Sequence, residues 1–296
     1  MSTRTRLERV SMAALFAILF AAPAEAQEPE FTGDLPYETT EVADGVYRFR
    51  HMFHNNVFVV TPDGVVAFDP LSQEAAGHYA AEIQRVAPGK GLLALIYSHD
   101  HADHISGGPT LFAALGEAPI IAHENAYAKL AAAQDAARPV PDITITDRAV
   151  LRFGGRTIEL HYVGKTHSDN MLVAYIPDSR LAFAVDFVSH DAVGYQTLPD
   201  WHYPELYGAI ERLLEIPFES IIFGHGPAGD RSSVERQLQY YRDLRDAVQD
   251  AINAGASKEE AVEQVDLEQY RDWQWYEEWF SMNVGKMYDW LSSDGG

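Results

Sequence analysis

Apolar and polar positions in the first half of the chain follow two different rhythms. Short apolar or alternating runs predict strands, whereas apolar residues spaced three or four positions apart predict helices. The strand pattern occurs at 45–50, 55–60, 65–69, 92–97 and 119–122. The helical pattern occurs at 72–87, 109–115 and 124–134. The run from Leu92 to Tyr97 is almost continuously apolar, which predicts a strand covered on both of its faces.

The second half of the chain repeats this arrangement after a break at Pro139 and Pro141. The pattern predicts further strands at 143–146, 149–152, 157–163, 171–176, 181–185 and 219–223, and a helix at 203–215. Each run of strands therefore comes with helices of its own. We expect an α/β protein in which two β-rich layers pack face to face with helices outside, a four-layer αββα sandwich.

The C-terminal part, 231–296, is predicted to be helical. One helix is expected at 231–254, and Ser257 and Glu260 have the spacing of a capping box that begins another. A third helical segment covers 267–291, which holds four of the five tryptophans. Its apolar and aromatic residues follow helical spacing, so we expect this face to pack on the sandwich.

Residues 1–26 have the pattern of a cleavable secretory signal peptide. Three arginines, at 4, 6 and 9, precede a short apolar run that leads to an Ala24-Glu25-Ala26 cleavage signature. A membrane anchor or a buried helix is the alternative, but the run is short for a bilayer span. We therefore expect export to the periplasm or the exterior. Residues 27–296 are expected to form one domain, with no membrane partner after cleavage.

The composition restricts both the partners and the chemistry. The chain of 296 residues carries 22 Lys and Arg against 44 Asp and Glu, a net charge of −22. Such acidity argues against nucleic acid as a partner, because phosphate backbones require clustered Lys and Arg. The absence of Cys excludes disulfides, thiolate ligands and a cysteine nucleophile. Any zinc site must therefore use His, Asp or Glu.

The densest cluster of such residues directly follows the predicted strand at 92–97. The segment Ser98-His99-Asp100-His101-Ala102-Asp103-His104 contains the pattern His-x-His-x-Asp-His at a strand end, where ligands bind in α/β layers. His99 and His101 could bind one metal ion, and Asp103 and His104 a second. These donors suit Zn²⁺. The alternative is a solvated or hydrogen-bonded loop, in which protonated imidazoles would repel one another.

Three more strand ends carry side chains that can bind a metal ion. His167 follows one predicted strand, Asp186 ends another, and His225 follows a third. Each alone is a weak signal, although a carboxylate after an apolar strand is costly to bury unless it is paired or ligated. Together with the motif, these positions supply seven candidate ligands, enough for two ions that share one of them.

With these residues the chain resembles the metallo-β-lactamase superfamily, from about Tyr47 to Pro227. The resemblance implies the αββα fold and two zinc ions per chain. It also implies the ligand roles: His99, His101 and His167 on the first zinc, Asp103, His104 and His225 on the second, and Asp186 bridging both. Asp69, in front of Pro70, matches the place of a carboxylate that supports a ligand, and its alternative is a simple turn residue.

The expected reaction is hydrolysis of a carbonyl in a small molecule, such as a β-lactam, lactone, ester or thioester. A metal-bound hydroxide is the attacking group, because two zinc ions lower the pKa of water toward about 7. Asp103 is the expected catalytic residue, which orients this hydroxide by accepting a hydrogen bond. Lactamases with a Cys at the position of Asp186 carry a substrate-binding Lys three residues later, where this chain has Ser189. The resemblance at Asp186 is instead to glyoxalase II and lactonases.

Two other functions fit the same residues. An iron oxidoreductase of the same superfamily, similar to persulfide dioxygenases, would use a single iron ion. A non-catalytic metal-binding protein would hold ions without turnover. Metal analysis and turnover assays separate these possibilities from a dizinc hydrolase.

Two connections are candidates for the wall of a substrate pocket, although ordinary packing is the alternative for each. One is the aromatic connection that follows Asp186 and contains His190, Asp191, Tyr195, Trp201, His202 and Tyr203. The other is a flap around His51, Phe53 and His54.

Overall fold

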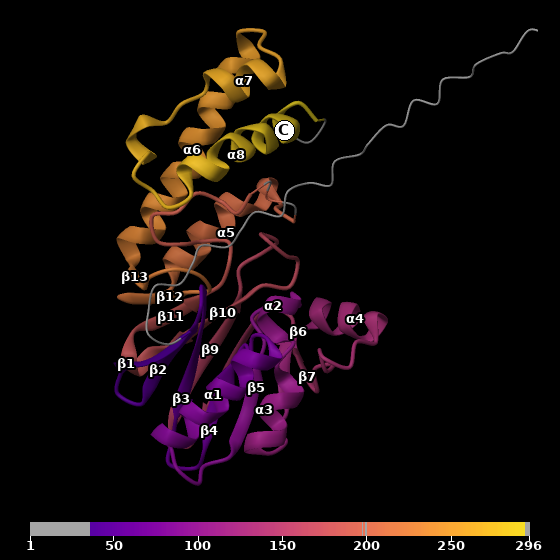
Figure 1. Cartoon of the computed structure of the whole chain (residues 1–296), viewed down its shortest axis with the longest axis vertical. Helices are drawn as coiled ribbons and strands as arrows, with labels where there is room; N and C mark the ends of the chain where they lie inside the picture. Colours follow the sequence, from indigo (N-terminus) through magenta and orange to yellow (C-terminus); the bar gives the residue numbers. More distant parts are fainter. Residues whose placement is uncertain (1–35, 197, 199, 294–296) are drawn as a thin grey trace, which may run out of the picture. The chain divides into compact units, whose positions relative to one another are not determined.

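Two β-sheets form the centre of the structure, a computed structural model that describes residues 36–196, 198 and 200–293 (Figure 1). The first sheet runs in the order β1 (Tyr37–Ala43), β2 (Val46–His51), β3 (His54–Val60), β4 (Val65–Phe68), β5 (Leu92–Ile96), β6 (Ile120–His123) and β7 (Ile143–Ile145). The second runs in the order β13 (Gly229–Asp230), β12 (Ser220–Phe223), β11 (Leu181–Ala184), β10 (Leu172–Ile176), β9 (Arg156–Tyr162) and β8 (Arg148–Phe153).

The helices form the outer layers. The first half contributes α1 (Gln73–Val86), α2 (Ala102–Ile105), α3 (Gly108–Leu115) and α4 (Glu124–Ala133). The second half contributes α5 (Tyr203–Glu215), α6 (Arg231–Asn253), α7 (Lys258–Gln264) and α8 (Tyr276–Leu291), with short 3₁₀ turns η1 (Pro177–Ser179) and η2 (Glu268–Tyr270). In Figure 1, α6, α7 and α8 lie together beyond α5, away from α1 and α3.

Alternation along the strands explains why the two sheets stack. In β4, Val66 and Phe68 face the second sheet, whereas Val65 and Ala67 face α1 and α3. The rings of Phe68 and Phe183 meet edge to face at 5.8 Å between their centroids, which joins β4 to β11 across the interface. The inner core continues through the second sheet to side chains of α5 and α6. The predicted four-layer αββα sandwich with C-terminal helices is confirmed.

The directions of the strands bring the chemistry to one edge. Strands β4, β5 and β6 run parallel in the first sheet, and β11 and β12 run parallel in the second. The carboxyl ends of parallel strands meet at the same edge of a sheet. The segments after β11 and β12 therefore leave the second sheet side by side, and His104 after β5 lies 3.3 Å from Asp186 after β11, so the two edges meet.

Two sequence expectations need correction. The strand predicted at 143–146 does not belong with the second run of strands, because β7 pairs in parallel with β6 at the edge of the first sheet. The helix predicted across 267–291 begins only at Tyr276. It is preceded by η2 and by Trp275, whose left-handed φ of 66° interrupts the helical backbone. The capping box of Ser257 and Glu260 at the start of α7 is confirmed.

Helix α8 packs mainly on α6 and α7, with a contact to the connection after Asp186. Buried Asn283 makes that contact: its amide donates to the carbonyls of Gly194 and Gln196, and its oxygen accepts from Gly194 N and the Tyr240 hydroxyl. A buried amide needs such partners. The predicted aromatic face of this segment therefore covers the connection and its neighbouring helices more than the sheets.

The described residues belong to one compact unit, and the signal peptide predicted at 1–26 lies outside them. Among the helices of this part of the chain, none has the length and apolar character to cross a bilayer.

Candidate metal centre

A change of backbone conformation divides the His-x-His-x-Asp-His motif into two halves. His101 is extended, with φ −71° and ψ 143°, and it caps the one-turn helix α2 that carries Asp103 and His104. His99 and His101 precede the helix, and the other two donors stand within it. The motif therefore presents its side chains to two neighbouring points.

The first point gathers His99, His101, His167 and Asp186, whose donor atoms all lie within 4.8 Å of one another. Asp186 Oδ2 is 3.3 Å from His99 Nε2 and 3.5 Å from His167 Nε2. His167 Nε2 is 2.9 Å from His101 Nδ1. These are the three imidazoles expected on the first ion.

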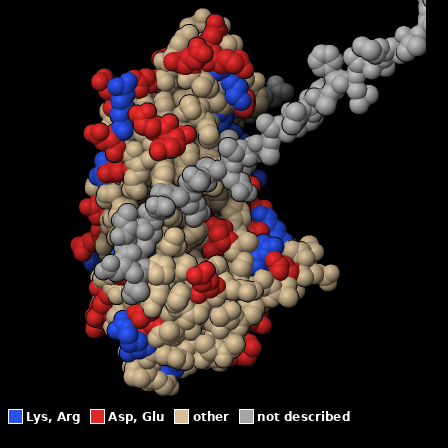
Figure 2. Space-filling model, viewed as in Figure 1, with Lys and Arg blue, Asp and Glu red and all other residues tan. Residues whose placement is uncertain are grey.

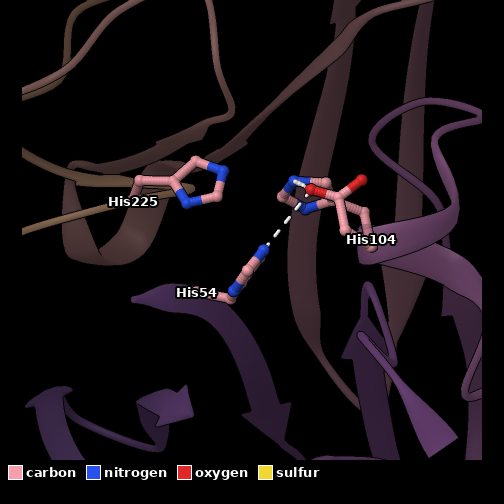
Figure 3. A group of neighbouring side chains, drawn as sticks. His54, His104 and His225 are labelled. Carbon is pink, nitrogen blue, oxygen red and sulfur yellow. Dashed lines mark hydrogen bonds and ion pairs between the residues drawn. The ribbon is translucent and has the colours of Figure 1, made fainter. Parts of the chain in front are cut away.

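The second point gathers His54, Asp103, His104 and His225, again within 4.8 Å (Figure 3). His104 Nε2 lies 3.4 Å from Asp103 Oδ2 and 3.3 Å from Asp186 Oδ2. His225 Nε2 lies 2.9 Å from Asp186 Oδ1. Asp186 thus touches donors of both clusters, which is the position expected for a bridging carboxylate. The structure brings all seven predicted ligands together.

The donor atoms fit divalent metal ions better than they fit hydrogen bonds with one another. The buried atoms His99 Nε2, His104 Nε2 and Asp186 Oδ1 have no hydrogen-bond partner within the described part of the chain. Each nevertheless lies within 3.3 Å of an imidazole nitrogen or carboxylate oxygen of another candidate ligand. Such orphaned polar atoms are rare in folded proteins. Ligands about 2.0–2.2 Å from one tetrahedral zinc ion lie about 3.3–3.6 Å apart. Most of the separations above fall in this range.

Asp69 holds two of the ligands in place from behind. Its carboxylate is fully buried, accepts from Ser98 N at 2.7 Å and from Ser98 Oγ at 2.6 Å, and lies 3.5 Å from His104 Nδ1. The same hydroxyl of Ser98 is 2.9 Å from His99 Nδ1. Carboxylates that bind the far nitrogen of a ligating imidazole fix its orientation and its tautomer. Asp69 therefore supports ligands, as the resemblance implied, besides standing at the turn before Pro70.

Gly224 allows the end of β12 to approach Asp186. A Cβ atom at this position would lie 2.5 Å from Val185 Cγ1 and 3.0 Å from Asp186 Oδ1. Real Cβ atoms do not come as close as the first contact, and the second is tighter than nine in ten real contacts. Glycine is thus required between β12 and His225 if His225 is to reach the bridging carboxylate.

Burial and charge set the protonation of the ligands. Burial acts to raise the pKa of Asp186, but the imidazoles of His104 and His225 lower it well below the ordinary value. Burial acts to lower the pKa of His104, but Asp186 and Asp103 raise it well above the ordinary value. A metal ion would take the place of this proton.

Two histidines of the first cluster are held in the neutral form that binds a metal ion. Burial lowers the pKa of His167 to about 4 and lowers the pKa of His101 as well. Both imidazoles are therefore neutral at pH 7, the form that binds a metal ion. In the second cluster, desolvation acts to raise the pKa of Asp103, but His104 and His54 lower it well below the ordinary value, so the carboxylate stays ionised.

Only some of the residues predicted to line a substrate pocket lie beside the two clusters. Trp201 is buried, with its ring 6.3 Å from that of His167, and Asp200 Oδ2 is 3.9 Å from His101 Nε2. His190 instead contacts Ser233, and Tyr203 stacks on Trp290. The expected flap residue His54 is part of the second cluster. Its sequence signal, a lone His in a hairpin, was too weak to identify it.

Comparisons with known proteins agree with this geometry. The family model of the metallo-beta-lactamase superfamily matches residues 50–239. The alpha subunit of 2,4-dinitroanisole O-demethylase from Nocardioides sp. (strain JS1661) is 26% identical over 233 residues, 78% of this chain and 65% of that protein. A type 2 metallo-beta-lactamase from Bacillus sp. (strain 170) is 28% identical over 182 residues, 60% of this chain and 68% of that protein. The match thus spans about two thirds of each relative's length.

Among solved structures, a metallo-beta-lactamase from Pontibacter korlensis has a TM-score of 0.59 at 21% identity, and the match covers 69% of this chain and 97% of that one. This likeness supports the fold. The family model covers more than half of the chain, and its range contains every residue of the two clusters. The chain therefore belongs to the metallo-beta-lactamase superfamily.

Proposed function

We propose that this protein is an exported dizinc hydrolase that opens a carbonyl substrate, such as a lactone, ester, thioester or β-lactam, with metal-activated water. The observation that carries the proposal is the place of Asp186. Its two oxygens lie 2.9–3.5 Å from imidazoles of both clusters, so one carboxylate can serve two ions. A single-iron oxidoreductase, the alternative, has no use for the second cluster of donors.

Two divalent ions held by these side chains would supply Lewis acidity and lower the pKa of water from about 15.7 to about 7. The residues themselves define the direction of approach. His99 and His104 are fully buried, whereas His101, His225 and Asp103 are 27%, 39% and 53% exposed. Water and substrate therefore reach the centre from the side of Asp103. Ionised and accessible, Asp103 can accept a hydrogen bond from the attacking water and orient it toward the carbonyl.

The surroundings favour substrates without a carboxylate. Ser189, which stands where some lactamases carry a substrate-binding Lys, hydrogen-bonds to Gln237 of α6 at 3.0 Å. Asp200 adds a negative charge beside His101. Acidic side chains are spread over the face in Figure 2, most densely over the C-terminal helices, and the net charge is −22. Because this field repels anions at long range, neutral lactones, esters and thioesters rank above β-lactams.

Metal content and turnover test the proposal together. The purified protein is analysed for metals and assayed against lactones, esters, thioesters, β-lactams and, because of the demethylase relative, an activated aryl methyl ether. We expect two zinc ions per chain, loss of turnover on chelation and recovery with zinc. His101→Ala should lose turnover, whereas His161→Ala, a half-buried histidine on β9 outside both clusters, should retain it.

Different results would point elsewhere. One iron per chain would favour the oxidoreductase. Unchanged turnover in His101→Ala would exclude the mechanism, and two bound zinc ions without turnover on any substrate would favour a metal-binding protein. Export is tested separately, by sequencing the N-terminus of protein from the periplasm or medium, where Gln27 is expected first.

A further inference from the structure

His54 occupies a constrained position at the start of β3. The turn that joins β2 to β3 contains Met52 and Phe53, and Met52 has a left-handed φ of 53°. His51 and His54 face each other across this turn. His54 is therefore the first residue of β3, directly after the hairpin turn. This turn lies at the edge of the sandwich where the parallel strands end.

The next residue fastens this hairpin to the loop that carries His225. Asn55 N donates to Gly224 O at 2.7 Å, and the Asn55 side-chain amide donates to Phe223 O at 3.1 Å and to Gly226 O at 2.7 Å. His54 and His225 form an isolated antiparallel bridge. Asn55 is fully buried, so these bonds are shielded from water. They hold His54 and His225 as a pair from opposite sheets.

The His54 side chain is directed into the second cluster (Figure 3). Its ring centroid is 4.6 Å from that of His225 and 5.7 Å from that of His104. Its Nε2 atom lies 3.4 Å from Asp103 Oδ2, the same distance that separates His104 Nε2 from that oxygen. This contact is a long hydrogen bond, and its length also lies within the spacing of two ligands around one zinc ion, about 3.3–3.6 Å.

We propose that His54 is a further protein ligand of the ion held by Asp103, His104 and His225, an assignment that rests on the two-metal function proposed above. Beside the shared Asp186, the second site then has three imidazoles and one carboxylate, and the first site has three imidazoles. The second site thus has one more protein ligand than the first, and fewer coordination positions of its ion are left for water. It therefore binds its ion more tightly than the first.

Stepwise zinc binding to the chelator-treated full chain tests the assignment. In His54→Ala, the tighter of the two binding steps is expected to weaken by more than about 10-fold, the lower end of what loss of even an outer supporting residue costs. The other step should stay unchanged. His161→Ala is the matched control, because His161 is also a half-buried histidine beside a carboxylate, 3.1 Å from Glu159.

A second variant reports coordination directly and does not depend on affinity or turnover. The chain has no Cys, so His54→Cys introduces its only thiol. Thiolates are good ligands for soft and borderline divalent metals. With Co²⁺ bound, the variant is expected to show a thiolate-to-cobalt charge-transfer band in the near ultraviolet, and His161→Cys is expected to show none.

The outcomes separate the two proposals. If the wild-type chain binds two ions, but His54→Ala binds both normally and His54→Cys shows no charge-transfer band, the ligand role of His54 is wrong and the dizinc function stands. If the wild-type chain binds fewer than two ions, both proposals fail. If the band appears without turnover on any substrate, the assignment of His54 stands and the hydrolase function fails.

Discussion

The metal centre and a separate trio of side chains, His51, Glu74 and His78, are built from the same kinds of residues. His51, Glu74 and His78 also bring their donor atoms within 4.8 Å of one another. Glu74 and His78 lie one turn apart on α1, and His51 ends β2. By composition and spacing alone, this trio matches the requirements of a zinc site as well as the centre does.

The two regions differ in how their donors are held. In the centre, the Asp69 carboxylate lies 3.5 Å from the far nitrogen of His104, the Ser98 hydroxyl hydrogen-bonds with the far nitrogen of His99, and the donors come from both sheets. In the trio, Glu74 is exposed, and the buried atom His51 Nε2 has no hydrogen-bond partner within the described residues. His78 instead stacks on Tyr37 at 4.4 Å. The comparison teaches that a metal centre requires supported donors, since unsupported side chains lose conformational entropy when they bind.

The largest effect is expected from removing the carboxylate that both ions share. Asp186→Asn should reduce tightly bound zinc from two ions to one or none and should lower turnover by at least about 10³-fold, equivalent to about 4 kcal/mol. Metal analysis and steady-state kinetics measure these effects. The matched control is Asp246→Asn, an exposed carboxylate of α6 that pairs with Arg245. Two tightly retained ions in Asp186→Asn would show that the clusters do not share this residue.

A smaller effect is expected from removing the charge of Asp69, which lies behind the ligands. Asp69→Asn keeps the shape of the side chain but removes the charge that orients His104 and Ser98. Zinc affinity should fall about 10–100-fold, as is typical for loss of an outer carboxylate. Competition with a chelator measures it, and Asp63→Asn in the exposed turn before β4 is the control. If affinity did not change, the contrast between supported and unsupported donors would lose its basis.

The smallest effect is expected at the surface trio. His78→Ala should leave tightly bound zinc at two ions per chain and should only lower stability, by about 0.5–1.5 kcal/mol, through the lost stacking on Tyr37. Thermal unfolding and metal analysis measure the two quantities, with Glu74→Gln as a second test of metal content. A third tightly bound ion that disappears in either variant would contradict the comparison.

The parts of the molecule that could be predicted have local causes. Alternation in β4 and helical spacing in α1 each depend on a few neighbouring residues, which is why their bounds were close to the expected ones. The seven ligands were identifiable because four of them lie in one short motif after an apolar strand, and the other three each follow the end of a further strand. The parallel strand directions placed the strand ends of each sheet at one edge of that sheet.

The parts that could not be predicted depend on contacts distant in sequence. Strand β7 joined the first sheet because its partner is β6, and its own residues carry no sign of that choice. Trp275 interrupts a segment whose spacing alone favoured a longer helix. His54 had no motif around it, and only the hydrogen bonds from Asn55 to the loop at Gly224 bring it beside His225.

By itself, the sequence determined the layered α/β fold, seven of the eight donors and the absence of thiolate chemistry, because periodicity, strand direction and residue type are properties of short segments. The tertiary structure alone decided which donors share a point in space, that Asp186 contacts both groups, that Asp69 supports two ligands and that His54 belongs with the second group. Those outcomes depend on how the two sheets stack. The packing of their inner faces determines the distances between residues that are more than a hundred positions apart in the sequence.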